Sequence, residues 1–251
     1  MSPTAIVART FLYTLLAALP LLACFAFAGL LGKTQDLSQT GATISRTDQE
    51  TDGAHMLVMQ KRELRLMALG CRASLPLDMR LAAAMGIADH AAIAPALGGV
   101  CVAGYWPIHE EADPRPLMDA LRVGGAELCL PAVVGEDLEF RRLHPDSELV
   151  AAGFGTKAPK DGVVLPDVLL VPLAAFDGEG GRIGYGRGFY DRALASLSKE
   201  KQVFTIGVAF ACQRVGNVPM EAHDRYLDAM VTEDGFEVYS EAFKRFLQQR
   251  T

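Results

Sequence analysis

The sequence lacks the motifs of a structural zinc site. It has no C-x-x-C pair, and its five histidines form no H-E-x-x-H motif. The five cysteines, at positions 24, 71, 101, 129 and 212, are odd in number and widely spaced, so no disulfide framework is indicated. This cysteine usage is typical of a reducing compartment, and we expect a cytoplasmic protein whose cysteines act mostly as small core residues.

The sequence also lacks an excess of basic residues. Its 24 Lys and Arg residues against 30 Asp and Glu give a formal net charge of −6, which argues against a nucleic-acid binder with a broad basic face. Hydrophobic residues make up 50% and charged residues 22% of the 251 residues. These are ordinary values for a globular protein, and the length suits one α/β domain or two small ones.

Charge is absent from residues 10–32, a stretch long enough to span a bilayer. Three interpretations stay open: a membrane anchor, a secretory signal with a small-residue site at residues 26–28, or a start assigned too far upstream, with Met56 or Met59 as the natural start. Residues 33–55 are polar and without periodicity, which is typical of a linker. We therefore expect residues 1–55 to lie outside the fold, residues 56–251 to form the domain, and membrane association only if residues 10–32 are retained.

From Met59 onward, apolar periodicity predicts alternating helices and strands. The predicted helices cover 59–75, 77–93, 114–125, 189–198 and 241–249, and the predicted strands cover 100–106, 126–134, 137–143, 166–176, 203–210 and 228–233. The segment 137–143 alternates apolar and polar residues, which favours an edge strand. The alternation predicts a single α/β domain with an open, mostly parallel sheet and helices on both faces.

The run GRIGYGRGFYDR, residues 181–192, lies between a predicted buried strand and a predicted helix. Glycines there let a backbone approach a polyphosphate, and Arg182 and Arg187 supply forked donors for phosphate oxygens. The run is neither a Walker A motif nor the G-x-G-x-x-G dinucleotide fingerprint. The alternative is a tight turn in which Asp191 caps the helix.

Residues 182–192 resemble the R-[LI]-G-x-G-x-G-[FY]-[FY]-D-R signature of the 5-formyltetrahydrofolate cyclo-ligase family. The resemblance continues over about residues 59–235. Matching segments are K-x-x-L-R at 61–65, Y-x-P-x-x-x-E at 105–111, L-P at 130–131, V-P-x-x-A-F-D at 171–177, G-V-A-F-x-x-Q at 207–213, H-D at 223–224 and T-E at 232–233. An ordered series of this length is far more specific than one glycine loop.

The resemblance implies a Rossmann-like open sheet and an ATP- and Mg²⁺-dependent enzyme. The implied reaction converts 5-formyltetrahydrofolate and ATP into 5,10-methenyltetrahydrofolate, ADP and phosphate, with ATP as co-substrate and Mg²⁺ as cofactor. Reduced folate and ATP are then the small-molecule partners, no nucleic acid is involved, and we expect a monomer.

The resemblance also implies roles for individual residues. The catalytic residues are Arg65 and Arg182, and the metal ligands are Asp191 and Asp224. The ATP-binding residues are Lys61, Arg62, Arg65, Arg182, Gly184, Tyr185, Gly186, Arg187, Gly188, Phe189 and Tyr190. The substrate-binding residues are Arg65, Trp106, Glu111, Tyr185, Gly186, Arg187, Gly188 and Phe189. Without the family, Lys61 and Arg65 would be read as a solvated face of one helix, because they are four residues apart.

Two positions depart from the family pattern. Arg187 stands where relatives often have glycine or lysine, and Ala158 stands where many have a glutamate before proline. The missing glutamate motivates an alternative function, a non-catalytic folate or nucleotide sensor with the same fold.

Overall fold

The computed structural model describes residues 46–160, 162–221 and 224–250. The apolar segment 10–32 and residues 33–45 of the predicted linker lie outside these ranges. Among the described residues, no helix has both the length and the apolar character needed to cross a membrane. Residues Gln49–Thr251 group into one unit by their contacts.

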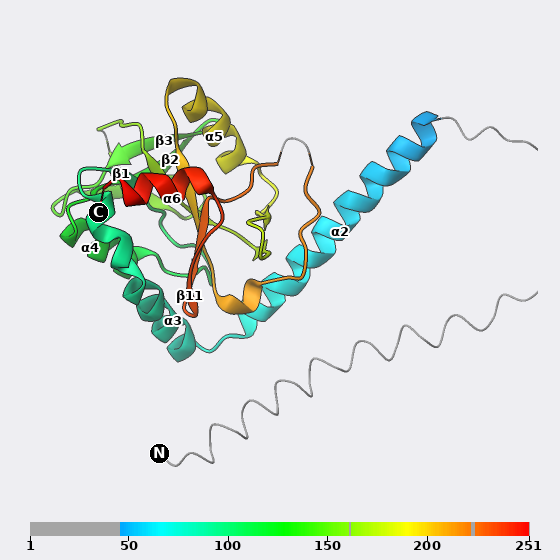
Figure 1. The fold of residues 1–251 in the computed structure, drawn as a ribbon, viewed down its shortest axis with the longest axis horizontal. Helices are drawn as coiled ribbons and strands as arrows, with labels where there is room; N and C mark the ends of the chain where they lie inside the picture. Colours follow the sequence, from blue (N-terminus) through cyan, green and yellow to red (C-terminus); the bar gives the residue numbers. More distant parts are fainter. Residues whose placement is uncertain (1–45, 161, 222–223, 251) are drawn as a thin grey trace, which may run out of the picture. The chain divides into compact units, whose positions relative to one another are not determined.

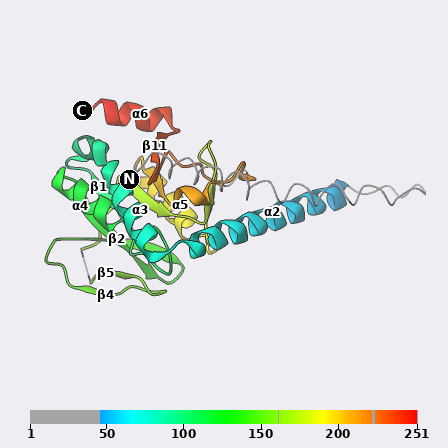
Figure 2. The same ribbon diagram turned by 90° about the horizontal axis from the view of Figure 1, so that it is seen from below.

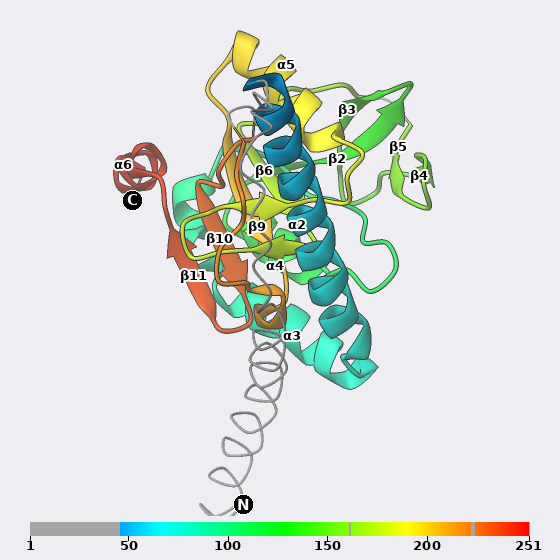
Figure 3. The same cartoon turned by 90° about the vertical axis from the view of Figure 1, so that its right-hand side faces the viewer.

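A seven-stranded sheet runs through the described part of the chain in the order β11-β10-β9-β6-β1-β2-β3 (Figure 1). The strands are β1 (Cys101–Ala103), β2 (Glu127–Val134), β3 (Asp137–Arg142), β6 (Val168–Pro172), β9 (Phe204–Val208), β10 (Ala229–Thr232) and β11 (Gly235–Val238). The inner neighbours pair in parallel, whereas β3 and β11 pair antiparallel at the two edges. Figure 3 shows β10 and β11 side by side at one edge. The predicted mostly parallel sheet and the predicted edge strand at 137–143 are both confirmed.

Alternate residues of the inner strands point to opposite faces of the sheet, as strand geometry requires. In β6, Val168 and Leu170 belong to the apolar cluster that contains residues of α3 (Leu77–Asp89), α4 (Arg115–Val123) and α6 (Glu241–Gln248). Leu169 and Val171 belong to a second cluster with residues of α5 (Phe189–Glu200). Helices therefore cover both faces, as predicted from the sequence.

Helix α2 (Arg46–Ser74) packs in a third apolar cluster, separate from the two clusters on the faces of the sheet. Ala68 of α2 is buried against Ala175, Ile183 and Val218, with Leu64 beside them. Ala175 and Ile183 belong to a short antiparallel pair, β7 (Ala175–Phe176) with β8 (Arg182–Ile183). This small cluster places α2 against the start of the glycine run.

Helix α2 begins earlier than predicted, and residues 46–55, expected as part of an irregular linker, are helical. Their polar composition gives no apolar period, but extending an existing helix costs little compared with starting one. The second predicted helix ends at Asp89, and the 3₁₀ helix η2 (Ala91–Leu97) follows. Pro95 lies inside η2. Proline has no N–H group to donate to the carbonyl four residues earlier, so an α-helix is disfavoured through this segment.

Two predicted strands are shorter than their apolar runs. Strand β1 ends at Ala103, and Tyr105 is buried because it packs in the core, where its hydroxyl donates to the carbonyl of Ala112 at 2.6 Å. The run 166–176 divides into β6 and β7, with the fully buried Leu173 and Ala174 between them. In both runs the residues just after the strand are still buried, so the buried segment is longer than the strand.

Four short strands were missed by the sequence analysis: β4 (Leu149–Ala151), β5 (Lys157–Pro159), β8 and β11. Strands β4 and β5 form a separate antiparallel pair, which Figure 2 shows below β2 and away from α6. Ala158 lies in β5 opposite Val150 and is fully buried in the core. The position where many relatives have glutamate is therefore a core position here.

The chain leaves β1 toward β2 and returns to the other side of β1 as β6. The strand order thus reverses between β1 and β6. In open parallel sheets, ligands bind outside the carboxyl ends of the strands at such a reversal. The segments that follow these two ends contain Trp106 and Glu111 after β1 and the glycine run after β6.

Candidate active site

A cavity of about 640 Å³ lies at this reversal. It is in the size range of pockets that hold small-molecule substrates. Its lining comes from distant segments: Lys61 and Arg65; Tyr105, Trp106, Ile108, His109 and Glu111; Pro131, Val133 and Leu138; Phe154 and Thr156; Pro172; residues 182–191; and Asp224 and Arg225.

Helix α2 carries a basic stripe, defined as Lys61, Arg65 and Arg72, of which Lys61 and Arg65 line the cavity. With Ala68 these residues have the spacing i, i+4, i+7, i+11, which keeps them on one helix face. Ala68 provides the close contact with the β7–β8 pair, and the basic residues on either side of it extend toward the glycine run, Glu221 and Asp224.

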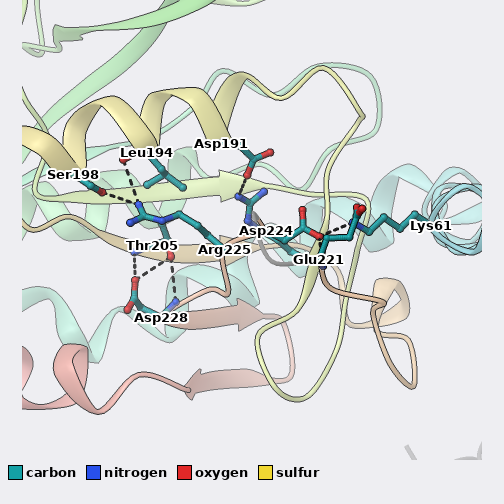
Figure 4. A network of polar contacts seen from close by, with 10 residues as sticks. Lys61, Asp191, Leu194, Ser198, Thr205, Glu221, Asp224, Arg225 and Asp228 are labelled. Carbon is teal, nitrogen blue, oxygen red and sulfur yellow. Dashed lines mark hydrogen bonds and ion pairs between the residues drawn. The ribbon is translucent and has the colours of Figure 1, made fainter. Parts of the chain in front are cut away.

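Lys61 is held by two carboxylates. Its Nζ lies 2.5 Å from Oε2 of Glu221 and 2.5 Å from Oδ2 of Asp224, and Figure 4 shows its side chain reaching toward both. Burial by itself would lower the pKa of Lys61, but the hydrogen bonds to Asp224 and Glu221 outweigh burial, so the pKa is raised. Lys61 is therefore firmly cationic.

The segment that contains Asp224 is fixed on both sides. Before it, the N–H of Val218 donates to Oδ2 of the buried Asp177 at 2.8 Å. After it, Arg225 donates to the Leu194 carbonyl and the Ser198 hydroxyl of α5, and Asp228 accepts from Thr205 of β9 (Figure 4).

The glycine run forms a loop that α2 and α5 hold. Nε of Arg65 donates to the Gly184 carbonyl at 2.7 Å. Gly186 has φ +88° and Gly188, the N-cap of α5, has φ +67°, conformations that favour glycine. Residues 188–191 at the start of α5 line the cavity, and the first N–H groups of a helix have no intrahelical partner, an arrangement suited to anions.

Arg182 and Asp191 form an ion pair across this loop. The Arg182 side chain is only 7% exposed, whereas that of Asp191, in the first turn of α5, is 48% exposed. Each carboxylate predicted to bind metal is therefore bonded to a cation predicted to bind phosphate. Within the described residues, no group of three His, Cys, Asp or Glu side chains is placed to hold a metal ion.

Glu111 is the partly buried acid of the cavity. His109 has φ +51°, a turn conformation that brings Oε2 of Glu111 within 2.9 Å of the Ile108 N–H, which donates to it. Burial raises the pKa of Glu111, and the hydrogen bond from Ile108 together with the influence of the Tyr185 hydroxyl offsets that rise only in part.

Aromatic rings form another part of the lining. The ring of Trp106 contacts two cations, with Cζ of Arg115 at 5.0 Å and Nζ of Lys157 at 5.2 Å from its centroid. Phe154 and Phe189 have ring centroids 5.6 Å apart, and Cζ of Arg187 lies 4.3 Å above the Phe154 ring. Arg187, predicted from the sequence to bind both ATP and substrate, therefore lies against the ring of Phe154.

A family model described as the 5-formyltetrahydrofolate cyclo-ligase family matches residues 58–233, well over half of the chain. The chain belongs to the 5-formyltetrahydrofolate cyclo-ligase family. This membership makes it an enzyme, and it confirms the resemblance drawn from the motifs over about the same residues.

Individual cyclo-ligases and synthetases agree with the family match. The 5-formyltetrahydrofolate cyclo-ligase of Escherichia coli (strain K12) is 39% identical over 140 residues, which cover 52% of this chain and 76% of that protein. The solved structure of Aquifex aeolicus 5,10-methenyltetrahydrofolate synthetase matches with a TM-score of 0.62 and 31% identity, over 72% of this chain and 93% of that one. The synthetase from Mycoplasma pneumoniae, with a TM-score of 0.55 and 22% identity over 69% of this chain and 98% of that one, shares the fold.

The cavity brings together the site residues predicted from the cyclo-ligase motifs, with one exception. Lys61, Arg65, Trp106, Glu111, residues 182 and 184–191, and Asp224 all line it. Arg62 is exposed on α2 and is not in the lining that the described residues form. Its assignment to ATP depends on the cyclo-ligase resemblance alone.

Arg72, Glu221 and Phe154 are among the residues at or near the cavity that the sequence did not predict. Arg72 continues the spacing of Lys61 and Arg65 by two helical turns, so helical periodicity could have identified it. Glu221 contacts Lys61 from 160 residues away, and Phe154 lies in the loop between two short strands. No local signal marks either position.

Proposed function

We propose that the protein cyclises 5-formyltetrahydrofolate to 5,10-methenyltetrahydrofolate, with ATP converted to ADP and phosphate and with Mg²⁺ required. The observation that supports this most is the single cavity in which the basic stripe, the glycine loop and the Trp106–Glu111 segment meet. It offers cations and backbone N–H groups on one side and a carboxylate with aromatic rings on the other.

The chemistry explains the need for ATP. A formamide oxygen is a poor leaving group, so attack by N10 on the formyl carbon would stall. Transfer of the γ-phosphoryl group to the formyl oxygen makes that oxygen part of a phosphate. N10 then bonds to the formyl carbon, the C–O bond breaks with its electron pair leaving on phosphate, and N10 gives up its proton. Positioning and charge neutralisation are the main contributions of a protein to phosphoryl transfer.

Lys61, Arg65 and Arg182 form the phosphate side of this proposal. Arg65 and Arg182 lie next to the loop of Gly184, Gly186 and Gly188, and both are the proposed catalytic cations. Forked guanidinium groups suit phosphate oxygens, because they donate two hydrogen bonds at once. Tyr185, Arg187, Phe189 and Tyr190 complete this side of the lining.

Asp191 and Asp224 fit a Mg²⁺ ion that comes with ATP. Both are carboxylates on the cavity wall, and Mg²⁺ prefers hard oxygen ligands together with phosphate oxygens and water. Bound Mg²⁺ would neutralise part of the phosphate charge. Because the two carboxylates form ion pairs with Arg182 and Lys61, we propose that these cations would turn to the phosphates of ATP and leave Asp191 and Asp224 to hold Mg²⁺.

Glu111 and Trp106 form the folate side. A half-buried carboxylate accepts hydrogen bonds from N–H groups of a pterin, and an aromatic ring flanks its plane. Phe154 belongs to this side, because its loop approaches Ile108 in the Glu111 segment. Arg187 and Phe189 join the two sides.

The test is the rise in methenyltetrahydrofolate absorbance when 5-formyltetrahydrofolate, ATP and Mg²⁺ are mixed with the folded protein. We expect the signal to require all three, and matched reactions without ATP or with EDTA are the controls. Folded protein that gives no ATP-dependent signal would contradict the proposal. Binding of both ligands at saturation without turnover would instead favour the sensor.

We further propose that reduced folate and ATP are the partners of a cytoplasmic monomer that binds no nucleic acid. The net charge of −6 and the cysteine usage support this proposal. Size-exclusion chromatography with light scattering tests the monomer, and a dimer mass would contradict it.

A further inference from the structure

Arg72 is a buried cation at the carboxyl-terminal end of α2, and none of the roles above uses it. Only 4% of the residue is exposed. Its Nη1 donates a hydrogen bond to the hydroxyl of Tyr185, and its Cζ lies 5.5 Å from the centroid of the Tyr185 ring. The side chain thus holds the tyrosine of the glycine loop both at the hydroxyl and at the ring face.

A buried arginine is costly unless a partner compensates its charge. The Tyr185 hydroxyl that accepts from Arg72 belongs to a side chain that lines the same cavity as Glu111, and both this hydroxyl and the positive charge of Arg72 lower the pKa of Glu111 and so favour its ionised form. The order Arg72–Tyr185–Glu111 therefore connects α2, the glycine loop and the segment after β1. The last member of this series, Glu111, is the carboxylate proposed to bind folate.

We propose that Arg72 is a positioning residue for the folate half of the cavity: it fixes the Tyr185 hydroxyl and, through it, the Glu111 carboxylate that receives the pterin. This proposal rests on the proposed function. It gives α2 two separate tasks, because Lys61 and Arg65 at one end of the basic stripe serve phosphate while Arg72 at the other end serves folate.

A purely structural role makes a different prediction. A cation in the last turn of a helix stabilises it through the helix dipole, whatever the neighbouring loop does. Loss of such a role would lower the melting temperature without separating the two substrates. The positioning role instead affects the KM for folate and leaves that for ATP unchanged.

The experiment compares Arg72→Met, Tyr185→Phe and the double variant, with Arg245→Met as control. Arg245 is an exposed arginine in the last turn of α6 and lies outside the cavity lining. We expect each single variant to raise the KM for 5-formyltetrahydrofolate about 10-fold or more, the size expected for a lost hydrogen bond to a charged group. In Arg72→Met the KM for ATP should stay within about 2-fold, and the double variant should raise the KM for folate no more than the single variants do, because they break the same connection.

The pH profile supplies a second readout. Loss of the Arg72 charge should move the acid limb of kcat/KM for folate to higher pH, since Glu111 then ionises less readily. Arg72→Lys, which keeps the charge, should restore the limb in large part. The charged and titratable groups that face Glu111 are Arg72 of α2, His109 of its own segment, Tyr105 at the end of β1, Tyr185 of the glycine loop and Tyr190 of α5.

Two results would overturn the proposal. One is an equal rise in the KM for folate and the KM for ATP in Arg72→Met, and the other is a rise in the KM for folate in the double variant equal to the product of the rises in the two single variants. If Arg72→Met does not fold, Arg72→Lys and Tyr185→Phe decide, since both retain most of the packing. If the wild-type protein shows no turnover, folate affinity is measured by quenching of Trp106, the sole tryptophan and part of the lining. Weaker binding in Arg72→Met would then support positioning although catalysis had failed, and unchanged binding would reject it.

Discussion

Arg182 is nearly enclosed, and its charge is met by a half-exposed partner, Asp191. Removing the arginine leaves a carboxylate that water can reach, so the fold should tolerate the change. The substrate phosphates would lose a preorganised donor, and such donors are worth about 100-fold or more in rate. We expect Arg182→Ala to lower kcat/KM for ATP by about this factor with little change in melting temperature.

The matched control for Arg182→Ala is Arg245→Ala, which removes an exposed arginine from α6. Steady-state kinetics at saturating 5-formyltetrahydrofolate measure the effect. Unchanged kinetics in Arg182→Ala would remove this residue from the phosphate site.

Ionisation of Glu111 in its partly buried position should lower the free energy of unfolding at neutral pH. Burial raises its pKa, so the folded protein holds this proton more tightly than the unfolded chain does. The associated stabilisation is complete below the unfolded pKa of about 4.5 and is lost as pH rises through the higher folded value. Glu111→Gln does not titrate, so its stability relative to wild type should increase over this interval and then level off.

Urea unfolding between pH 4 and 8 checks the Glu111→Gln prediction, and assays of the same samples should show weaker folate binding. If the difference in unfolding free energy between Glu111→Gln and wild type stayed constant with pH, the prediction would be contradicted, because ionisation of Glu111 would then not destabilise the fold.

At the scale of elements, the docking of α2 depends on a small side chain. Ala68 is 4% exposed and packs on the β7–β8 pair between the two ends of the basic stripe. A glutamate there would press a longer, charged side chain against the apolar Ala175, Ile183 and Val218, a change that costs about 3 kcal/mol or more. Because displacements of about 1 Å can cost 100-fold in rate, we expect Ala68→Glu to lose at least that much activity.

Leu66 offers the control on the same helix, since it is 62% exposed. Leu66→Glu should leave turnover and melting temperature close to wild type. Activity retained by Ala68→Glu would mean that the basic stripe reaches the cavity without this contact.

The helices and strands were predicted correctly where the apolar pattern of the sequence coincides with buried residues of the structure. The inner strands β2, β6 and β9 lie inside apolar runs, and α5 begins at Phe189 as predicted. The same apolar signal overextends β1, because Tyr105 is buried by packing and not by pairing. The edge strand β11, with two exposed residues among its four, has too little apolar pattern to be recognised.

At the scale of the whole molecule, the cavity draws on residues from Lys61 to Arg225. The motifs predicted most of its lining, because they preserve the residue types that the proposed chemistry needs. They could not predict which charges pair in the free protein. The bonds of Lys61 with Glu221 and Asp224 depend on the packing of α2 against a segment some 160 residues away.

The first part of the chain provides a prediction at the same scale. In α2 the cavity contacts begin at Lys61, and Met56, Val58 and Met59 are exposed. We expect a chain that starts at Met56 to keep its melting temperature within about 2 °C of the full-length protein, less than the shift expected for 1 kcal/mol. Its kcat/KM should also be unchanged.

Calorimetry and the cyclisation assay on the two chains, purified identically, test the Met56 prediction. A loss of stability or turnover in the shorter chain would show that residues 1–55 support the domain.

The attachment of α2 has a consequence for hydrogen exchange. The two large clusters on the sheet contain no α2 residue among those described, so α2 is joined mainly by the Ala68 cluster and the bonds of the basic stripe. An element held in this way opens locally at a lower free energy than global unfolding requires. Each opening separates the proposed phosphate-binding cations from the glycine loop, so the measured affinity for ATP includes the cost of keeping the helix closed. Without ATP, amides in residues 61–72 should therefore exchange faster than those of β6 and β9, and ATP at 100 times its Kd should slow exchange in residues 61–72 by about 100-fold.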